Sequence, residues 1–158
     1  MLPEAQELAF DLMEKIKSWT EPQYVGNRMH WAAELGDLLQ VPGATHMMND
    51  TLEHLVTFVI PNEPDPKVIT ELFRALEYGC HYSSVDVNLD PLVEEVGYGG
   101  RDTAFLCWVL LMLAKQGGDK HIDFVREHLK SEHESVRRNA EYAWKHRFAE
   151  RERKLRGE

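Results

Sequence analysis

The sequence predicts an all-α fold of about four stacked antiparallel helix pairs in a single domain. Three observations support this prediction. Apolar residues recur every three or four positions through most of the chain, which is the spacing of one helix face. Proline and glycine interrupt that spacing and so separate the helices. A short motif also recurs at an offset of 36 residues, as expected when similar helix pairs stack.

The first half of the chain contains helices that are predicted from their apolar stripes. They cover residues 3–19, 27–39, 45–60 and 66–78. In the first of them, Leu8, Leu12, Ile16 and Trp19 are expected to share one face. Before the fourth, Asp65 is placed as an N-cap and Pro66 as the first helical residue. Gly79 then has the position of a C-terminal cap, which predicts that this helix ends there.

The second half begins with residues 80–89, the longest segment without a helical period, which we interpret as a loop. A short helix is then predicted over residues 90–96, followed by helices over 101–116 and 119–130. The helix over 101–116 is apolar nearly all round and is therefore expected to be buried on most sides. Ser131 and Glu134 have the spacing of a capping box and are expected to begin the last helix. We assign residues 1–150 to one domain and 151–158 to a charged tail.

The repeated motif pairs four residues with four others at the offset of 36: Arg101, Ala104, Cys107 and Trp108 with Arg137, Ala140, Ala143 and Trp144. With the short polar turn before it, this pattern resembles a HEAT repeat, most clearly over residues 90–146 and only weakly before residue 60. The resemblance implies an α-solenoid, and such proteins usually bind other proteins along an extended surface. The alternative is an irregular helical bundle in which the matches arise by chance.

Composition narrows the classes of function. The net charge is -9, and residues 1–100 hold 17 acidic side chains against 5 basic ones. This balance argues against nucleic-acid binding, which needs a basic footprint. A third hypothesis is nevertheless that the basic C-terminal run, which consists of Arg147, Arg151, Arg153, Lys154 and Arg156, binds the phosphates of a nucleic acid. The longest apolar run, residues 104–114, is too short to span a bilayer, and the start of the chain lacks the pattern of a signal peptide. With Cys80 and Cys107 interpreted as thiols rather than a disulfide, we expect a cytoplasmic protein.

No motif in the chain predicts catalysis, a metal or a cofactor. The sequence contains neither HExxH nor CxxC, and the pair considered, Asp50 and His54, lies four residues apart on one helix face. Gly97 to Gly100 do not match a dinucleotide-binding fingerprint and are interpreted as a turn. We therefore expect a protein that is not an enzyme and needs no cofactor or metal.

The candidate binding residues surround the longest loop, where carboxylates are flanked by tyrosines. They are Tyr82, Asp86, Asp90, Glu94, Glu95 and Tyr98. Tyrosine anchors ringed by polar groups are typical of binding surfaces, whereas the alternative is that these carboxylates only cap and solvate a short helix. We expect a basic protein partner. Size and charge alone resemble those of immunity proteins, which would imply that the partner is a basic, nuclease-type bacterial toxin. The rival hypothesis is a small-molecule or enzymatic pocket lined by Trp108, Tyr82 and His81.

Overall fold

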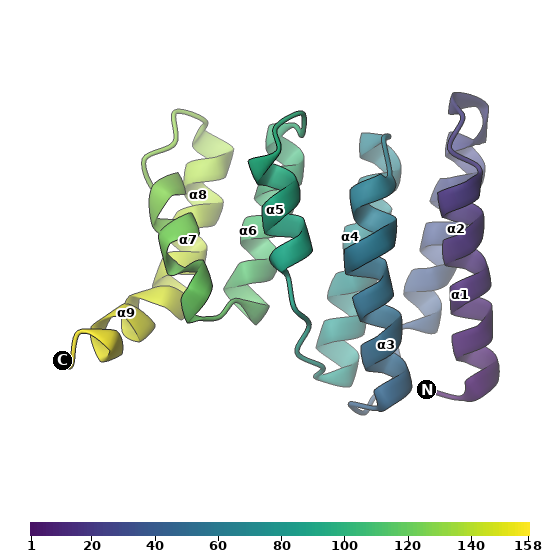
Figure 1. The fold of residues 1–158 in the computed structure, drawn as a ribbon, viewed down its shortest axis with the longest axis horizontal. Helices are drawn as coiled ribbons and strands as arrows, with labels where there is room; N and C mark the ends of the chain where they lie inside the picture. The colour runs from purple at the N-terminus through teal and green to yellow at the C-terminus, as the bar shows by residue number, and fades with distance from the viewer. The chain divides into compact units, whose positions relative to one another are not determined.

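The computed structural model describes residues 1–158 and contains helices and no strand, which confirms the all-α prediction (Figure 1). The α-helices are α1 (Pro3–Ser18), α2 (Val25–Leu38), α3 (His46–His54), α4 (Pro66–Ser83), α5 (Asp90–Gly97), α6 (Thr103–Gln116), α7 (Ile122–His128), α8 (Glu134–Ala143) and α9 (Ala149–Leu155). Turns of π-helix over Leu55–Val59 and Trp144–Phe148 continue α3 and α8. No helix combines the length and apolarity needed to cross a bilayer.

The chain divides into two compact units, Met1–Leu92 and Val93–Glu158, which we call unit 1 and unit 2. In unit 1, α2 packs against both α1 and α4, and α3 packs against the same two helices. The predicted stripe of α1 is only partly buried, because Leu12 and Ile16 lie in the core whereas Leu8 and Trp19 are about half exposed. Met13 and Ala9 complete the buried face instead.

The start of α4 agrees with the prediction, but its end does not. Asp65 Oδ1 accepts a hydrogen bond from the backbone N–H of Lys67 at 2.8 Å, so the predicted N-cap is confirmed. The helix continues through Gly79 to Ser83, and Ser84 provides the left-handed residue that ends it, with φ of 58°. Gly79 is instead a packing residue, because a Cβ there would lie 2.5 Å from Leu52 Cδ2. The predicted C-cap was therefore wrong.

Residues 84–89 form a segment without secondary structure that begins at the left-handed Ser84, so the predicted loop is shorter than expected. Its side chains alternate as in a strand, with Val85, Val87 and Leu89 buried and the residues between them exposed. This alternation fixes which side chains of the segment face solvent.

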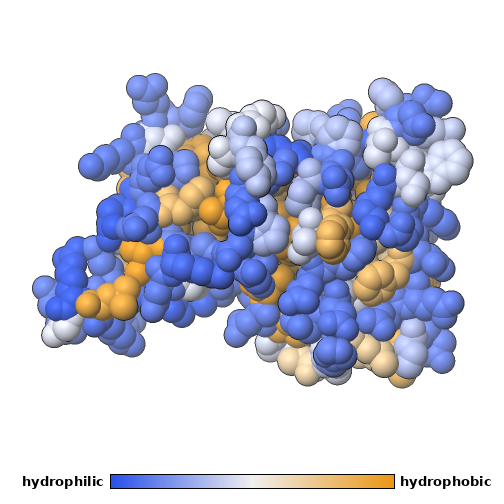
Figure 2. Space-filling model, in the orientation of Figure 1, coloured by the Kyte–Doolittle hydropathy of each residue, from blue (hydrophilic) through white to orange (hydrophobic).

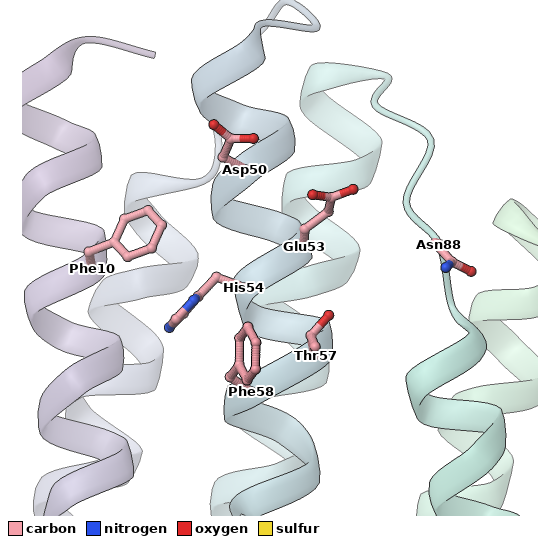
Figure 3. Close-up of a pocket in the computed structure, with 7 residues that line it drawn as sticks. All are labelled: Phe10, Asp50, Glu53, His54, Thr57, Phe58 and Asn88. Atoms are coloured by element: carbon pink, nitrogen blue, oxygen red, sulfur yellow. The ribbon is translucent and has the colours of Figure 1, made fainter.

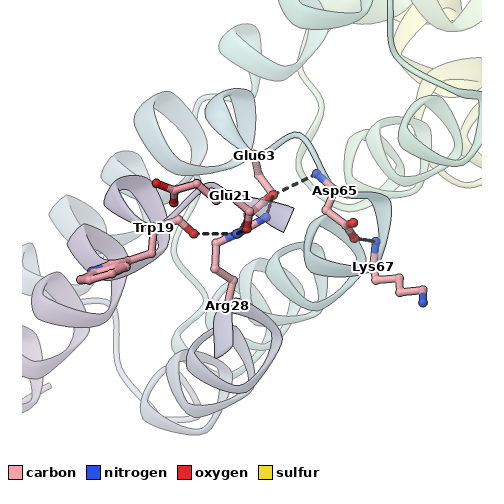
Figure 4. A network of polar contacts seen from close by, with 6 residues as sticks. All are labelled: Trp19, Glu21, Arg28, Glu63, Asp65 and Lys67. Atoms are coloured by element: carbon pink, nitrogen blue, oxygen red, sulfur yellow. Dashed lines mark hydrogen bonds and ion pairs between the residues drawn. The ribbon is translucent and has the colours of Figure 1, made fainter. Parts of the chain in front are cut away.

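A buried ion pair joins two inter-helix turns of unit 1 (Figure 4). Arg28, on α2, donates from Nε to Glu63 Oε1 at 2.7 Å and from Nη2 to Oε2 at 3.2 Å. Its Nη1 donates to the carbonyl oxygens of Trp19 and Glu21 at 2.6 and 3.0 Å, in the turn between α1 and α2. Glu63, in the turn between α3 and α4, also accepts from the backbone N–H of Asp65 at 2.9 Å. The arginine side chain thus ties both turns to α2.

In unit 2, α6 and α7 both pack against α8. The prediction that α6 is buried on most sides was only partly right, because Cys107, Trp108 and Leu111 remain half-exposed. Neither Cys80 nor Cys107 forms a disulfide.

The predicted capping box of unit 2 was wrong. His133 is the N-cap residue of α8 and makes no side-chain cap, while the Ser131 hydroxyl accepts a hydrogen bond from the His133 N–H at 3.2 Å. Most of the predicted tail is helical, since α9 extends to Leu155 and Arg126 Nη2 pairs with Glu152 Oε1 at 2.7 Å.

Candidate functional site

Three of the predicted binding residues belong to unit 1. Tyr82 lies on the last turn of α4 rather than on a loop, is 46% exposed, and packs its ring edge-on against His81 at 5.3 Å between centroids. Asp86 lies on the exposed edge of the segment 84–89, and Asp90 is half-buried at the start of α5. Tyr82 and Asp86 are therefore available to a partner, and Asp90 less so.

The other three belong to unit 2. Glu94, on α5, is exposed, and Tyr98 just after it is 79% exposed. Glu95 Oε1 pairs with Arg101 Nε at 3.0 Å, and the Arg101 guanidinium lies over the ring of Phe105 at 4.7 Å. Because Glu95 already pairs with Arg101, it fits the alternative that these carboxylates only cap and solvate a short helix better than it fits a binding role. Tyr98 and Glu94 keep the features expected of contact residues.

A hollow of about 350 Å³ lies on the α1–α3 side of unit 1, and we call it the acidic hollow (Figure 3). It is lined by Phe10 of α1, by Asp50, Glu53 and His54 of α3, by Thr57 and Phe58 of the following π-turn, and by Asn88. Since alternate residues of an extended segment face the same way, Asp86 shares the exposed edge with Asn88. One of the predicted residues thus lies next to this hollow.

His54 stands between the two aromatic rings of the acidic hollow. Its ring centroid lies 4.9 Å from that of Phe10 and 5.1 Å from that of Phe58. Lys17 Nζ lies 3.1 Å from His54 Nε2, and Glu14 Oε1 lies 2.6 Å from Lys17 Nζ. Burial, with a smaller contribution from the Lys17 ammonium, lowers the pKa of His54, and the Glu14 carboxylate opposes this. His54 is therefore neutral at pH 7 and accepts a hydrogen bond from Lys17.

The remaining charge in the acidic hollow is negative. Asp50 Oδ2 lies 3.2 Å from His46 Nε2, but its side chain is still 43% exposed, and Glu53 is exposed. Phe58 is 51% exposed, which is unusual for a phenylalanine. Lys17 Nζ already lies 5.9 Å from the centroid of the Phe58 ring. The exposed part of the ring, in a hollow with two carboxylates, is suited to a further cationic side chain, which gains both ion pairing and a cation–π contact.

The acidic hollow has one hydroxyl-bearing side chain among its lining residues. Its one hydroxyl, on Thr57, makes no hydrogen bond to a base that could activate it, and no group of three or more His, Cys, Asp or Glu side chains in the chain could hold a metal ion. The sequence pattern indicated Asp50 and His54 only as possible metal ligands. The contact between Phe10 of α1 and His54 of α3, which brings the lining residues of the acidic hollow together, could not be predicted from any local pattern in the sequence.

Residues of the rival small-molecule hypothesis fall in both units. His81 and Tyr82 contact each other on α4 in unit 1, whereas Trp108 lies on α6 in unit 2. In unit 2, Trp108 lines an open hollow of about 380 Å³ whose other lining residues are Thr103, Ala104, Cys107, Leu111, Ser135 and Asn139. This hollow is mostly apolar and carries no charged group.

The surface seen in Figure 2 is largely hydrophilic, with apolar side chains in separate patches. No protein-family model, curated protein or solved structure matches the chain. Its function must therefore be inferred from the chemistry of its own residues.

Proposed function

We propose that the protein is a non-catalytic binding module that recognises a basic protein partner through the acidic hollow of unit 1. The observation that carries this proposal is the exposed ring of Phe58 beside the carboxylates of Asp50 and Glu53. An aromatic side chain in a hollow with a polar rim is typical of residues that dominate a binding energy. A partner that places one cation over Phe58 and another beside Glu53 or Asp50 would make both kinds of contact in the same hollow.

Electrostatics supports a basic partner. Acidic side chains greatly outnumber basic ones in unit 1, and Lys17, the cation nearest the acidic hollow, already pairs with Glu14. A surface of one sign accelerates the encounter with a partner of the opposite sign, and salt screens this attraction. The complex is therefore expected to form quickly at low ionic strength and to weaken as salt is added.

The packing of unit 1 supports the further proposal of a HEAT-like arrangement. The pairs α1–α2 and α3–α4 pack so that α2 meets α4 and α1 meets α3, as in two stacked repeats. A concrete version of the function is an immunity protein that neutralises a basic, nuclease-type toxin in the cytoplasm. Size, acidity and two cysteines that form no disulfide support this version.

The proposal is tested by a tagged pull-down from the native host, washed at low and at high salt, followed by titration of the basic protein that is recovered. Phe58→Ala is expected to weaken binding by at least about 30-fold, the scale of a dominant contact residue. Asp50→Asn with Glu53→Gln is expected to slow association and reduce the salt dependence. Helical circular dichroism should not change, because these side chains are on the surface.

A matched control removes two exposed carboxylates of unit 2, as Glu127→Gln with Glu132→Gln, which changes the net charge equally. We expect this control to bind nearly as well as the unaltered protein. Equal weakening by the control and by the Asp50/Glu53 variant, or unchanged binding by Phe58→Ala, would show that the acidic hollow is not the binding surface.

The carboxylates around the segment 84–89 give a separate test of how far the surface extends. Alanine at Asp86, Asp90 and Glu94 together is expected to weaken the same complex and to leave the helical content intact, because these side chains are wholly or partly exposed. A normal affinity in this variant would confine the contact to the acidic hollow.

A further inference from the structure

A second surface of unit 1 lies on the opposite side of α1 from the acidic hollow. On its α3 side, α1 donates from Gln6 Nε2 to the Met47 carbonyl at 3.1 Å and places Phe10 against His54. Successive helix residues are about 100° apart, so Leu8 points roughly away from that side. Leu8 is 47% exposed.

The neighbouring helix α2 contributes the other wall. Gly36 faces α4, since a Cβ there would lie 3.4 Å from Tyr78 Cδ2 and 3.7 Å from Ala75 Cβ. Glu34 and Leu38, each two positions from Gly36, therefore lie on the side of α2 that faces away from α4. The uncovered sides of α1 and α2 together form a groove.

We define this outer groove by its lining residues, Leu8, Leu12, Glu34, Asp37 and Leu38, which enclose about 390 Å³. Three leucines give it an apolar floor, and Glu34 and Asp37 give it an acidic wall. On α1, Glu4 and Asp11 lie on the same side as Leu8 by helical spacing. Glu4, Asp11 and Asp37 make no ion pair, whereas Glu34 Oε1 lies 2.8 Å from His30 Nε2. Lys15 shares the side of Leu8 by the same spacing and lies over the Trp31 ring, so the surface carries one lysine against four carboxylates and keeps a net negative charge.

We propose that the outer groove binds a basic amphipathic helix of a partner protein. A groove between two helices accepts a third helix, as it does wherever helix pairs stack. Leucines of the incoming helix would cover Leu8 and Leu38, and its lysines or arginines would meet Glu34, Asp37 and Asp11. This goes beyond the proposed function, because the outer groove and the acidic hollow share no residue. Charge complementarity selects a basic helix over an acidic or neutral one.

The test uses the full chain and a synthetic amphipathic peptide of about 18 residues, with leucines at helical spacing and lysines and arginines beside them. Binding is measured by fluorescence anisotropy and mapped by backbone amide chemical shifts. We expect shifts concentrated at Leu8, Asp11, Glu34 and Leu38. Leu8→Gln, which keeps a good helix former at an exposed site, should weaken binding about tenfold. Asp37→Asn should reduce the salt dependence.

Controls separate this proposal from general attraction to an acidic protein. The Asp50→Asn/Glu53→Gln variant of the acidic hollow should bind the peptide normally, and the chain without peptide should be monomeric by light scattering. A helix-breaking proline in the peptide should abolish binding. Shifts centred on the acidic hollow, equal weakening by both sets of variants, or a dimer that Leu8→Gln dissociates would overturn the proposal. Because Leu8→Gln and Asp37→Asn leave Phe58 intact, failure of this proposal is distinct from failure of the proposed function.

Discussion

Removal of the Glu63 carboxylate is expected to be among the most destabilising changes in unit 1. In Glu63→Ala, Arg28 keeps its hydrogen bonds to the carbonyls of Trp19 and Glu21 but loses its counter-ion while remaining buried. Breaking a buried ion pair on one side costs about 3–5 kcal/mol. The Asp65 N–H loses its acceptor as well, which adds about 1 kcal/mol. Domains of this size are stable by about 5–15 kcal/mol, so the change should be large.

The assay is urea unfolding followed by circular dichroism, with the midpoint and the slope both fitted. The control is Glu71→Ala, which removes the partner of Arg74 from an ion pair of 2.8 Å whose arginine is more than half exposed. Such surface pairs contribute at most about 1 kcal/mol. A loss for Glu63→Ala no larger than for Glu71→Ala would refute the argument that this pair holds the two turns together.

Two further predictions concern packing and pH. Gly79→Ala should lower the free energy of unfolding in urea by about 1–3 kcal/mol, because the added Cβ would meet Leu52 Cδ2. The control Gly26→Ala, whose Cβ would have nothing within 4 Å, should be neutral or stabilising, and equal effects of the two variants would contradict the packing role of Gly79. His54 has a lowered pKa in the folded protein, so the unfolded chain binds its proton more readily, and stability should fall as pH drops from about 6.5 towards the folded pKa. His54→Asn should flatten this slope of melting temperature between pH 7 and 5.5, and an unchanged slope would assign the effect to other groups.

Much of the fold could be predicted because the signals for helices are local. Apolar spacing and the caps at Asp65 and Pro66 place the helices of unit 1 within a few residues of their observed bounds. The predicted end of α4 was wrong because a glycine can either end a helix in a left-handed conformation or allow another helix to pack closely. From the sequence alone, the helix end is the favoured interpretation. Only the approach of Leu52 from α3 shows that Gly79 is needed for packing and not for a left-handed turn.

The candidate site was harder to predict, because it depends on contacts between helices. Asp86 and Tyr98 were identified from composition and are exposed, as a binding role requires. Phe58 was overlooked, since in the sequence it is one apolar residue inside an apolar helix. Its exposure follows from the way α3 packs on α1, where Val56 and Val59 are buried in its place. The partner of Arg28 was equally hidden, because Glu63 lies 35 residues away in sequence.

The two proposed surfaces use opposite sides of α1. Phe10 contributes to the acidic hollow and Leu8 to the outer groove, and two residues along a helix are about 200° apart around its axis. A single straight helix therefore cannot contact both, whereas a larger partner could reach both only by passing around α1. If the two surfaces are independent, the basic helical peptide will bind equally well with and without the partner recovered from the host. Competition between them would instead mean that one partner uses both sides of α1.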